Sequence, residues 1–175
     1  YDSIEFLREY NLRGSAAIGK KVVVIGGGNA AVDAARTAVR LGAESVTILY
    51  RRTRDEMPAY KEEIEEAENE GVIIKTLVAP QEIVSKSGKV AGVRCNHMWL
   101  GDFDSSGRRR PQVREDGDSF GEPADQVIAA VGQSLDTKSV LGDLPVKTKL
   151  NGFVASDALY GRTSLDWLFA GVLFP

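Results

Sequence analysis

The sequence has few cysteines and histidines, and each shortage argues against a kind of site. The single cysteine, Cys95, cannot form an internal disulfide or a thiolate metal cluster. The single histidine, His97, has no cysteine or carboxylate cluster near it in the sequence, so we expect a structural role for it. No lysine lies four residues after a tyrosine, so the acid–base pair of short-chain dehydrogenases is absent. We therefore expect neither a catalytic residue nor a metal site in this chain.

The sequence also lacks an excess of positive charge and a long hydrophobic run. Its 22 lysines and arginines are outnumbered by 25 acidic residues, which gives a net charge of -3. Proteins that bind the nucleic-acid backbone normally carry a basic excess, so we expect no nucleic-acid partner. No hydrophobic run approaches the roughly 18 to 20 residues of a membrane-spanning helix, so we expect no membrane partner. One cysteine and no signal-peptide pattern predict a cytoplasmic protein.

Hydrophobic residues make up 43% of the chain and follow the alternation of an α/β domain. Lys21–Ile25 is a β-branched run between glycines, which predicts a strand buried on both faces. The alanine-rich segment 30–41, followed by Gly42, predicts a helix packed closely on a sheet. The same reasoning predicts a short helix at 2–10, a strand at 45–50, a helix at 58–70 and a strand at 72–78. This series predicts a Rossmann-like parallel sheet with helices on both faces.

Residues 81–124 depart from that order. Alternating hydrophobicity at 81–85 and 89–100, around the turn Lys86-Ser87-Gly88, predicts a β-hairpin and its extension. The polar stretch 101–121 predicts a surface loop, on which we expect Arg108, Arg109 and Arg110 to be solvated rather than to meet an acidic partner. Residues 125–132 again predict a buried strand. We therefore expect an antiparallel β-meander inserted at 81–124.

The first predicted strand is followed directly by a segment that matches the dinucleotide-binding pattern G-x-G-x-x-A, namely Gly26-Gly27-Gly28-Asn29-Ala30-Ala31. We expect Gly26 to make the tight turn, Gly28 to let the backbone approach a pyrophosphate, and Ala31 to keep helix and strand close. The free N–H groups and positive dipole end of the following helix favour an anion. Glycine-rich turns also occur in proteins that bind nothing, but the position between a valine-rich strand and an alanine-rich helix favours dinucleotide binding.

Arginines stand where an NAD-specific site normally has an acidic residue for the ribose 2′-hydroxyl. Arg51 and Arg52 end the second strand, and they predict binding of the 2′-phosphate of NADP(H). The alternative is that both arginines only keep a loop soluble, and Arg54 is a weaker third candidate. A second glycine turn, Val131-Gly132, follows the last predicted strand, and we expect the nicotinamide half of the cofactor near it.

These motifs resemble the NADPH domain of glutamate synthase small (beta) subunits and related flavoproteins. The resemblance covers nearly the whole chain. It is carried by residues 22–36 (VVVIGGGNAAVDAAR), 41–43, 46–52 (VTILYRR), 56–59 (EMPA) and 70–72, then by 93–95, 98–101, 106–111 (SGRRRP), 124–125 and 130–133 (AVGQ).

The resemblance implies a domain inserted in a larger FAD-binding protein, where NADPH passes a hydride to flavin and electrons continue through iron–sulfur clusters to a partner or large catalytic subunit. Residues 1–18 would be a helix and linker from the parent FAD domain, 19–175 the NAD(P)H-binding domain, and 163–175 the start of the return to the FAD domain. The FAD fingerprint and the iron–sulfur cysteines are absent, and Ala170-Gly171-Val172-Leu173 departs from the flavin-binding turn of the family. We therefore expect FAD in the parent protein and not in this chain, which by itself is expected to be inactive.

Two other functions remain open at the level of the sequence. One is a nucleotide-sensing module without redox chemistry, and the other is a self-sufficient NAD(P) dehydrogenase. The lack of an acid–base pair argues against the second.

Overall fold

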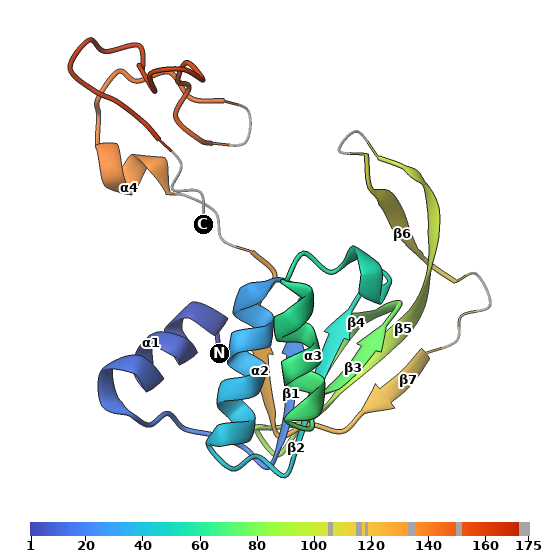
Figure 1. Ribbon diagram of the computed structural model, residues 1–175. Coiled ribbons are helices and arrows are strands. Elements are labelled where there is room, and N and C mark those ends of the chain that lie inside the picture. The colour runs from blue at the N-terminus through green and yellow to red at the C-terminus, as the bar shows by residue number, and fades with distance from the viewer. Residues whose placement is uncertain (105–106, 115–116, 118, 133–135, 150–151, 172–175) are drawn as a thin grey trace. The chain divides into compact units, whose positions relative to one another are not determined.

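The computed structural model describes residues 1–104, 107–114, 117, 119–132, 136–149 and 152–171. The chain forms two compact units, Tyr1–Val131 and Gly132–Pro175. The elements of both units are labelled in Figure 1.

A parallel sheet forms the centre of the first unit (Figure 1). Its strands are β1 (Lys21–Ile25), β2 (Ser45–Tyr50), β3 (Ile73–Thr76) and β8 (Gln126–Ala129), in the order β3-β2-β1-β8. The register aligns Ile25 with Leu49 on one side and with Ala129 on the other. The carboxyl ends of β1, β2 and β8 therefore lie at one edge, as the predicted Rossmann-like fold requires, and that fold class is confirmed.

Three helices cover one face of this sheet: α1 (Ser3–Arg13), α2 (Asn29–Arg40) and α3 (Lys61–Asn69). Phe6 of α1 and Ile64 of α3 pack with Val22 and Ile48 of the sheet in one hydrophobic core. The sheet-facing side of α2 is made of fully buried small residues, which let the helix lie close to the strands: Ala31, Ala34, Ala35 and Ala38. Ala31 is one of these buried residues, and its part in binding a dinucleotide stays a prediction.

The other face of the sheet differs from the prediction, because antiparallel strands cover it where helices were expected. In the described residues, β4 (Val78–Lys86), β5 (Lys89–Phe103) and β7 (Ser119–Glu122) form this layer. Val93 and Cys95 of β5 pack against Val23, Leu49 and Val127 in a second hydrophobic core. The predicted meander is therefore present, and it is a layer of the fold.

The polar stretch predicted to be a surface loop contains two strands, which corrects that prediction. β6 (Arg109–Val113) pairs with the far part of β5, from Met98 to Phe103, and β7 pairs with the near part. The ribbon of β5 and β6 extends away from the parallel sheet (Figure 1). No residue of β6 is buried, so its sequence lacks the alternation of buried and exposed residues that identifies a strand.

Helix α3 starts at Lys61, later than the predicted Pro58, because the preceding residues lie against the glycine-rich loop. The Ala59 backbone N–H donates to the Gly27 carbonyl (3.2 Å), and Pro58 is the neighbour of Gly28. A short 3₁₀ helix, η1 (Arg54–Glu56), precedes this segment.

Helix α1 is longer than predicted and belongs to the core of the first unit. Phe6 is fully buried, and Asp2 forms an isolated parallel bridge with Ala129 of β8. Asp2 also caps the helix, since its carboxylate accepts from the Ile4 and Glu5 backbone N–H groups. The assignment of residues 1–18 to a parent FAD domain stays a prediction. Within the described residues, no helix is long and apolar enough to cross a bilayer.

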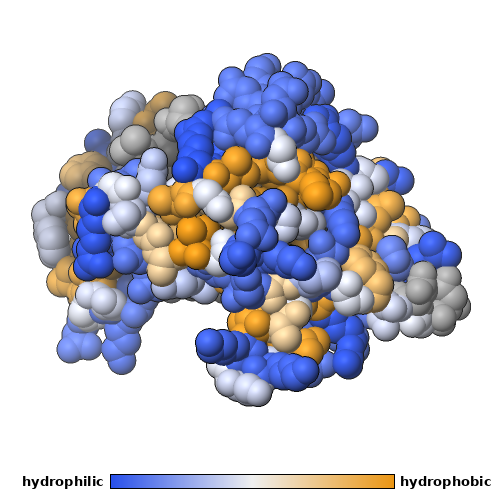
Figure 2. Space-filling model, turned by 90° about the horizontal axis from the view of Figure 1, so that it is seen from below, coloured by the Kyte–Doolittle hydropathy of each residue, from blue (hydrophilic) through white to orange (hydrophobic). Residues whose placement is uncertain are grey.

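The second unit contains α4 (Thr137–Leu141) and two isolated antiparallel bridges, Thr148 with Val154 and Arg162 with Phe169. No described residue of this unit is buried, and several large hydrophobic side chains are at least 61% exposed: Val140, Leu159, Tyr160, Trp167 and Phe169. Hydrophobic residues of the molecule as a whole also reach the surface, between hydrophilic ones, on the face shown in Figure 2. The predicted return to a FAD domain at 163 falls inside this unit, and Val172 and Leu173 lie outside the described residues.

Candidate functional site

The glycine-rich loop leaves β1 between β2 and β8, and Gly26 is fixed by both neighbours. The Gly26 N–H donates to the Leu49 carbonyl (3.1 Å), and the Ala130 N–H donates to the Ile25 carbonyl (2.8 Å). Gly26 has φ +147°, and a Cβ added here would collide with the Ala130 carbonyl oxygen. The fold therefore requires glycine at this position whether or not a ligand binds.

Gly27 has a different reason to be glycine. A Cβ at this position would overlap the ring of Tyr50, the last residue of β2. This ring is only 7% exposed, and its hydroxyl donates to the Glu56 carbonyl (2.7 Å). The absent side chain of Gly27 thus makes room for the tyrosine that joins β2 to the next loop.

Gly28 is not required by its surroundings. Its backbone has φ -89° and ψ 177°, which any residue can adopt. A Cβ added here would meet only Pro58 Cγ, at 3.8 Å, which is ordinary contact. The chain leaves space above this glycine, where the dinucleotide pattern predicts that pyrophosphate approaches the backbone.

Helix α2 begins directly at this open glycine. Gly28 is its N-cap, no side chain caps the helix, and the first turn contains no acidic residue. The Ala31 N–H donates to the Gly28 carbonyl (2.9 Å), so the Asn29 and Ala30 N–H groups and the positive dipole end are the groups available to an anion, without competition from a carboxylate. The Asn29 side chain accepts from the Tyr60 N–H (3.1 Å), so it fixes the start of α3.

The two arginines after β2 have different environments. The Arg52 side chain is only 7% exposed, and its guanidinium donates to the Arg109 carbonyl (2.9 Å) and lies 3.4 Å from the Asp104 carboxylate. Arg51 is exposed and makes no hydrogen bond or ion pair with the residues that the structure describes. Arg54 pairs with Glu68 at 2.6 Å. Arg51 is thus the arginine of this group whose charge is open to a ligand.

A local hydrogen-bond network shapes the β2 loop, by which we mean residues 51–57. The Glu56 carboxylate accepts from the Thr53 hydroxyl (2.7 Å) and from the Thr53 backbone N–H (3.3 Å). The hydrogen bond from the Thr53 hydroxyl is the largest cause that lowers the pKa of Glu56. A charged Glu56 therefore maintains the turn that follows Arg51 and Arg52.

Val131 and Gly132 follow the end of β8. Val131 is 75% exposed, and Gly132 has φ +108° with nothing within 4 Å of an added Cβ. Gly132 begins the second unit, and Gln133 lies outside the described residues. Their contact with the nicotinamide half of a cofactor stays a prediction.

The single histidine and the single cysteine both lie in β5. The His97 ring packs on Phe120, with ring centroids 4.8 Å apart. Cys95 is fully buried, and burial raises the pKa of its thiol to about 11. A thiol with this pKa remains protonated and unreactive near neutral pH, so Cys95 acts as a core residue.

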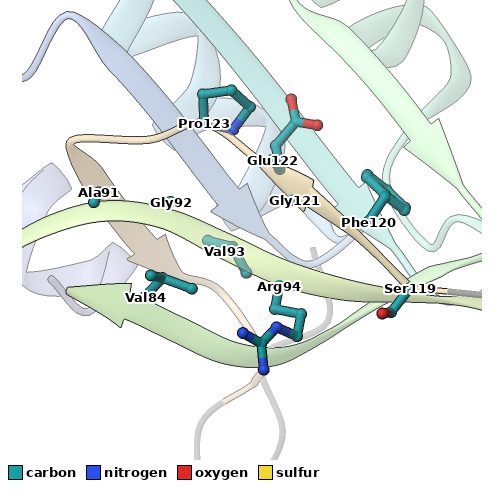
Figure 3. Close-up of a pocket in the computed structure, with 10 residues that line it drawn as sticks. All are labelled: Val84, Ala91, Gly92, Val93, Arg94, Ser119, Phe120, Gly121, Glu122 and Pro123. Carbon is teal, nitrogen blue, oxygen red and sulfur yellow. The ribbon is translucent and has the colours of Figure 1, made fainter. Parts of the chain in front are cut away.

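A shallow pocket of about 380 Å³ lies over the antiparallel layer and is separate from the glycine-rich loop. Gly92, Gly121, Val84, Arg94 and Phe120 are among the residues that line it (Figure 3). Its arginine already pairs with Glu82 at 3.0 Å. Nothing in this pocket indicates a dinucleotide.

Sequence comparison agrees with this geometry. The profile of the pyridine nucleotide-disulphide oxidoreductases matches residues 1–171. The chain belongs to this family. The match includes the glycine-rich loop, the β2 loop and the antiparallel layer.

Two curated relatives support the resemblance found in the sequence. The chain is 44% identical over 169 residues to the NADP(+)-dependent formate dehydrogenase subunit beta of Moorella thermoacetica, covering 96% of this chain and 24% of the relative. It is 41% identical over 155 residues to the glutamate synthase [NADPH] small chain of Azospirillum brasilense, covering 88% of this chain and 32% of the relative. This chain thus resembles glutamate synthase small chains. It spans a third or less of the length of each of these two relatives.

A solved structure supports the fold. Thioredoxin reductase from T. acidophilum matches 95% of this chain and 46% of its own, with a TM-score of 0.70 and 24% identity.

Proposed function

We propose that this chain is the NADP(H)-binding domain of a flavin-dependent oxidoreductase related to glutamate synthase small chains. The observation that carries the proposal is Gly28. The fold accepts a side chain at this position, so a ligand that approaches the backbone gives the physical reason for glycine. The adjacent N-terminus of α2, free of acidic side chains, is the matching group for a pyrophosphate.

The 2′-phosphate would meet the β2 loop, because this loop leaves the strand next to the glycine-rich loop. Arg51 is exposed and unpaired among the described residues, so it is the group proposed to bind the phosphate. Arg52 is held by Asp104 and Arg109, so its proposed part is to fix the loop. NADPH, once bound, supplies a hydride, and this chain supplies position and charge.

The parent protein is part of the proposal. The relatives are named as a beta subunit and a small chain, which supports an assembly with other subunits. The second unit has no buried residue among those described, and five of its large hydrophobic side chains are at least 61% exposed, so it needs further protein to form a core. We propose that a FAD domain provides that cover, with iron–sulfur or large catalytic subunits as later electron acceptors.

The proposal is tested by substituting Gly28 and a matched glycine. Gly28→Ala should fold, because its Cβ meets only one atom at 3.8 Å, yet bind NADPH about tenfold more weakly or worse, because the Cβ occupies the pyrophosphate position. Gly121→Ala is the control, since an added Cβ there meets nothing within 4 Å and the residue lies in β7, away from the glycine-rich loop.

Calorimetric titration with NADPH and thermal unfolding are measured for both variants. Binding that survives unchanged in Gly28→Ala would overturn the assignment of the pyrophosphate site.

A further inference from the structure

The β5–β6 hairpin reaches the β2 loop through Arg108, which the sequence analysis expected to be solvated. The Arg108 guanidinium donates to the Tyr50 hydroxyl (3.2 Å) and to the Glu56 carbonyl (2.9 Å). Tyr50 precedes the β2 loop at the end of β2, and Glu56 lies near the end of the loop, in η1. One side chain therefore joins both ends of the loop to a hairpin more than fifty residues away in sequence.

A second connection crosses the same interface in the opposite direction. Arg52 of the β2 loop donates to the Arg109 carbonyl at 2.9 Å. Asp104 accepts from the Arg108 backbone N–H (3.2 Å) and lies 3.4 Å from the Arg52 guanidinium. The hairpin and the loop thus hold each other through charged hydrogen bonds, which are stronger than neutral ones.

Among the described residues, this interface leaves one arginine of the β2 loop without an ion pair. Arg51 stands between Tyr50 and Arg52, whose side chains are both tied to the hairpin, while its own side chain is exposed. A binding group on a fixed backbone loses less conformational freedom when its ligand arrives, so the same contact gives a higher affinity.

We propose that Arg108 is a positioning residue for cofactor choice: it fixes the β2 loop so that Arg51 faces the 2′-phosphate of NADP(H). The inference rests on the proposed function and adds a residue that lies far from the dinucleotide motif in sequence. Arg108 acts through the loop and makes no contact with the phosphate.

The test compares NADPH and NADH binding in matched arginine variants. Arg108→Ala should bind NADPH about three- to tenfold more weakly and bind NADH within about twofold of wild type, because NADH has no 2′-phosphate. Arg110→Ala is the control, since Arg110 is exposed and carries the same charge, and its side chain makes no hydrogen bond or ion pair in the described part of the chain. Both affinities of this control should stay near the wild-type values.

A double-mutant cycle with Arg51→Ser separates positioning from direct contact. If Arg108 acts through Arg51, Arg108→Ala should weaken NADPH binding no further once Arg51 is serine. Additive losses would mean that Arg108 touches the phosphate itself and would overturn the inference. So would equal losses for NADPH and NADH, or a loss in Arg110→Ala as large as in Arg108→Ala.

The wild type distinguishes failure of the inference from failure of the proposed function. Equal affinities for NADPH and NADH in the wild type would overturn the NADP assignment, and the inference with it. A wild type that prefers NADPH, combined with an unaffected Arg108→Ala, would overturn the inference alone. If Arg108→Ala does not fold, Tyr50→Phe removes the hydroxyl that Arg108 contacts, keeps the ring beneath Gly27, and should shift the preference in the same direction.

Discussion

At the scale of single residues, three consecutive glycines have three separate causes. Gly26 is required by its backbone angle and the Ala130 carbonyl, and Gly27 by the Tyr50 ring. Gly28 alone has space that the protein does not use. The dinucleotide pattern treats Gly27 as a variable position, although here its lack of a side chain is needed for packing.

Gly27→Ala should therefore damage folding, in contrast to Gly28→Ala. A methyl group that overlaps a buried aromatic ring forces that ring to move, at a cost of about 1–3 kcal/mol in the free energy of unfolding. Urea unfolding of the two variants gives the comparison. Equal stability of Gly27→Ala and wild type would show that the Tyr50 ring does not depend on this glycine.

The sequence analysis proposed the glycines and Arg51 as cofactor-binding residues, but it gave no role to Tyr50 or Arg108. This difference has a physical reason. The glycine pattern and the arginines at the end of β2 are local, so their spacing in the sequence predicts their place. The contacts of Arg108 with Tyr50 and Glu56 depend on β5 and β6 folding back across the sheet. No local periodicity records such a contact, and the run of three arginines indicated only a polar surface.

At the scale of elements, α2 and α3 are joined at their exposed side by Glu70. Its carboxylate accepts from the guanidinium groups of Arg36 (2.8 Å) and Arg40 (2.6 Å), and the Arg36 hydrogen bond is the largest cause that lowers the pKa of Glu70. The Glu70 side chain is 27% exposed, so solvent screens these contacts only in part.

Glu70→Gln should destabilise the protein by about 1–2 kcal/mol near neutral pH, because it removes a charged acceptor from two arginines. The pKa is lowered on folding, so this stabilisation is complete above the unfolded value of about 4.3 and is lost as pH falls through the folded value. Glu66→Gln is the control, since Glu66 pairs with Arg36 at 2.6 Å but its side chain is 59% exposed.

The measurement is the free energy of unfolding of wild type and both variants from acidic to neutral pH. If the difference in the free energy of unfolding between wild type and Glu70→Gln stays constant down to acidic pH, the ionised Glu70 carboxylate is not the cause of that difference.

At the scale of the element order, the fold was predictable where hydrophobic patterns are regular. The strands β1 and β2 have the predicted bounds, and α2 differs from its prediction by one residue at each end. The layer on the second face was predicted as helical because β-α-β repeats usually place helices on both faces. Here β4, β5 and β7 cover the second face of the parallel sheet and bury Val93 and Cys95 against it. The pairing of β5 with β7 joins strands that are distant in sequence, so no short segment of the sequence predicts it.

At the scale of the whole molecule, the chain contains one dinucleotide fingerprint, and its second unit buries none of the residues that the structure describes. We therefore expect the 175-residue chain to purify without flavin and to reduce a dye acceptor with NADPH at a negligible rate. Hydride transfer needs an acceptor held at about 3–3.5 Å from the donor, which this chain is not expected to provide.

The absorption spectrum of the purified protein and a dye-reduction assay measure both expectations. A yellow preparation with stoichiometric FAD, or rapid turnover without an added flavoprotein, would contradict the division between this chain and a parent FAD domain.

The pairing of β1 with β8 has a consequence for how the protein acquires its site. Val22 pairs with Gln126, so the sheet closes only after the whole antiparallel layer has been made. Contacts between residues so distant in sequence form slowly, because a long loop must close first. During synthesis β1, β2 and the helices can associate early. Ala130, whose carbonyl lies against Gly26, is made only after the antiparallel layer. The glycine-rich loop would then take its final shape last, and a nascent chain that stops before β8 should not bind the cofactor.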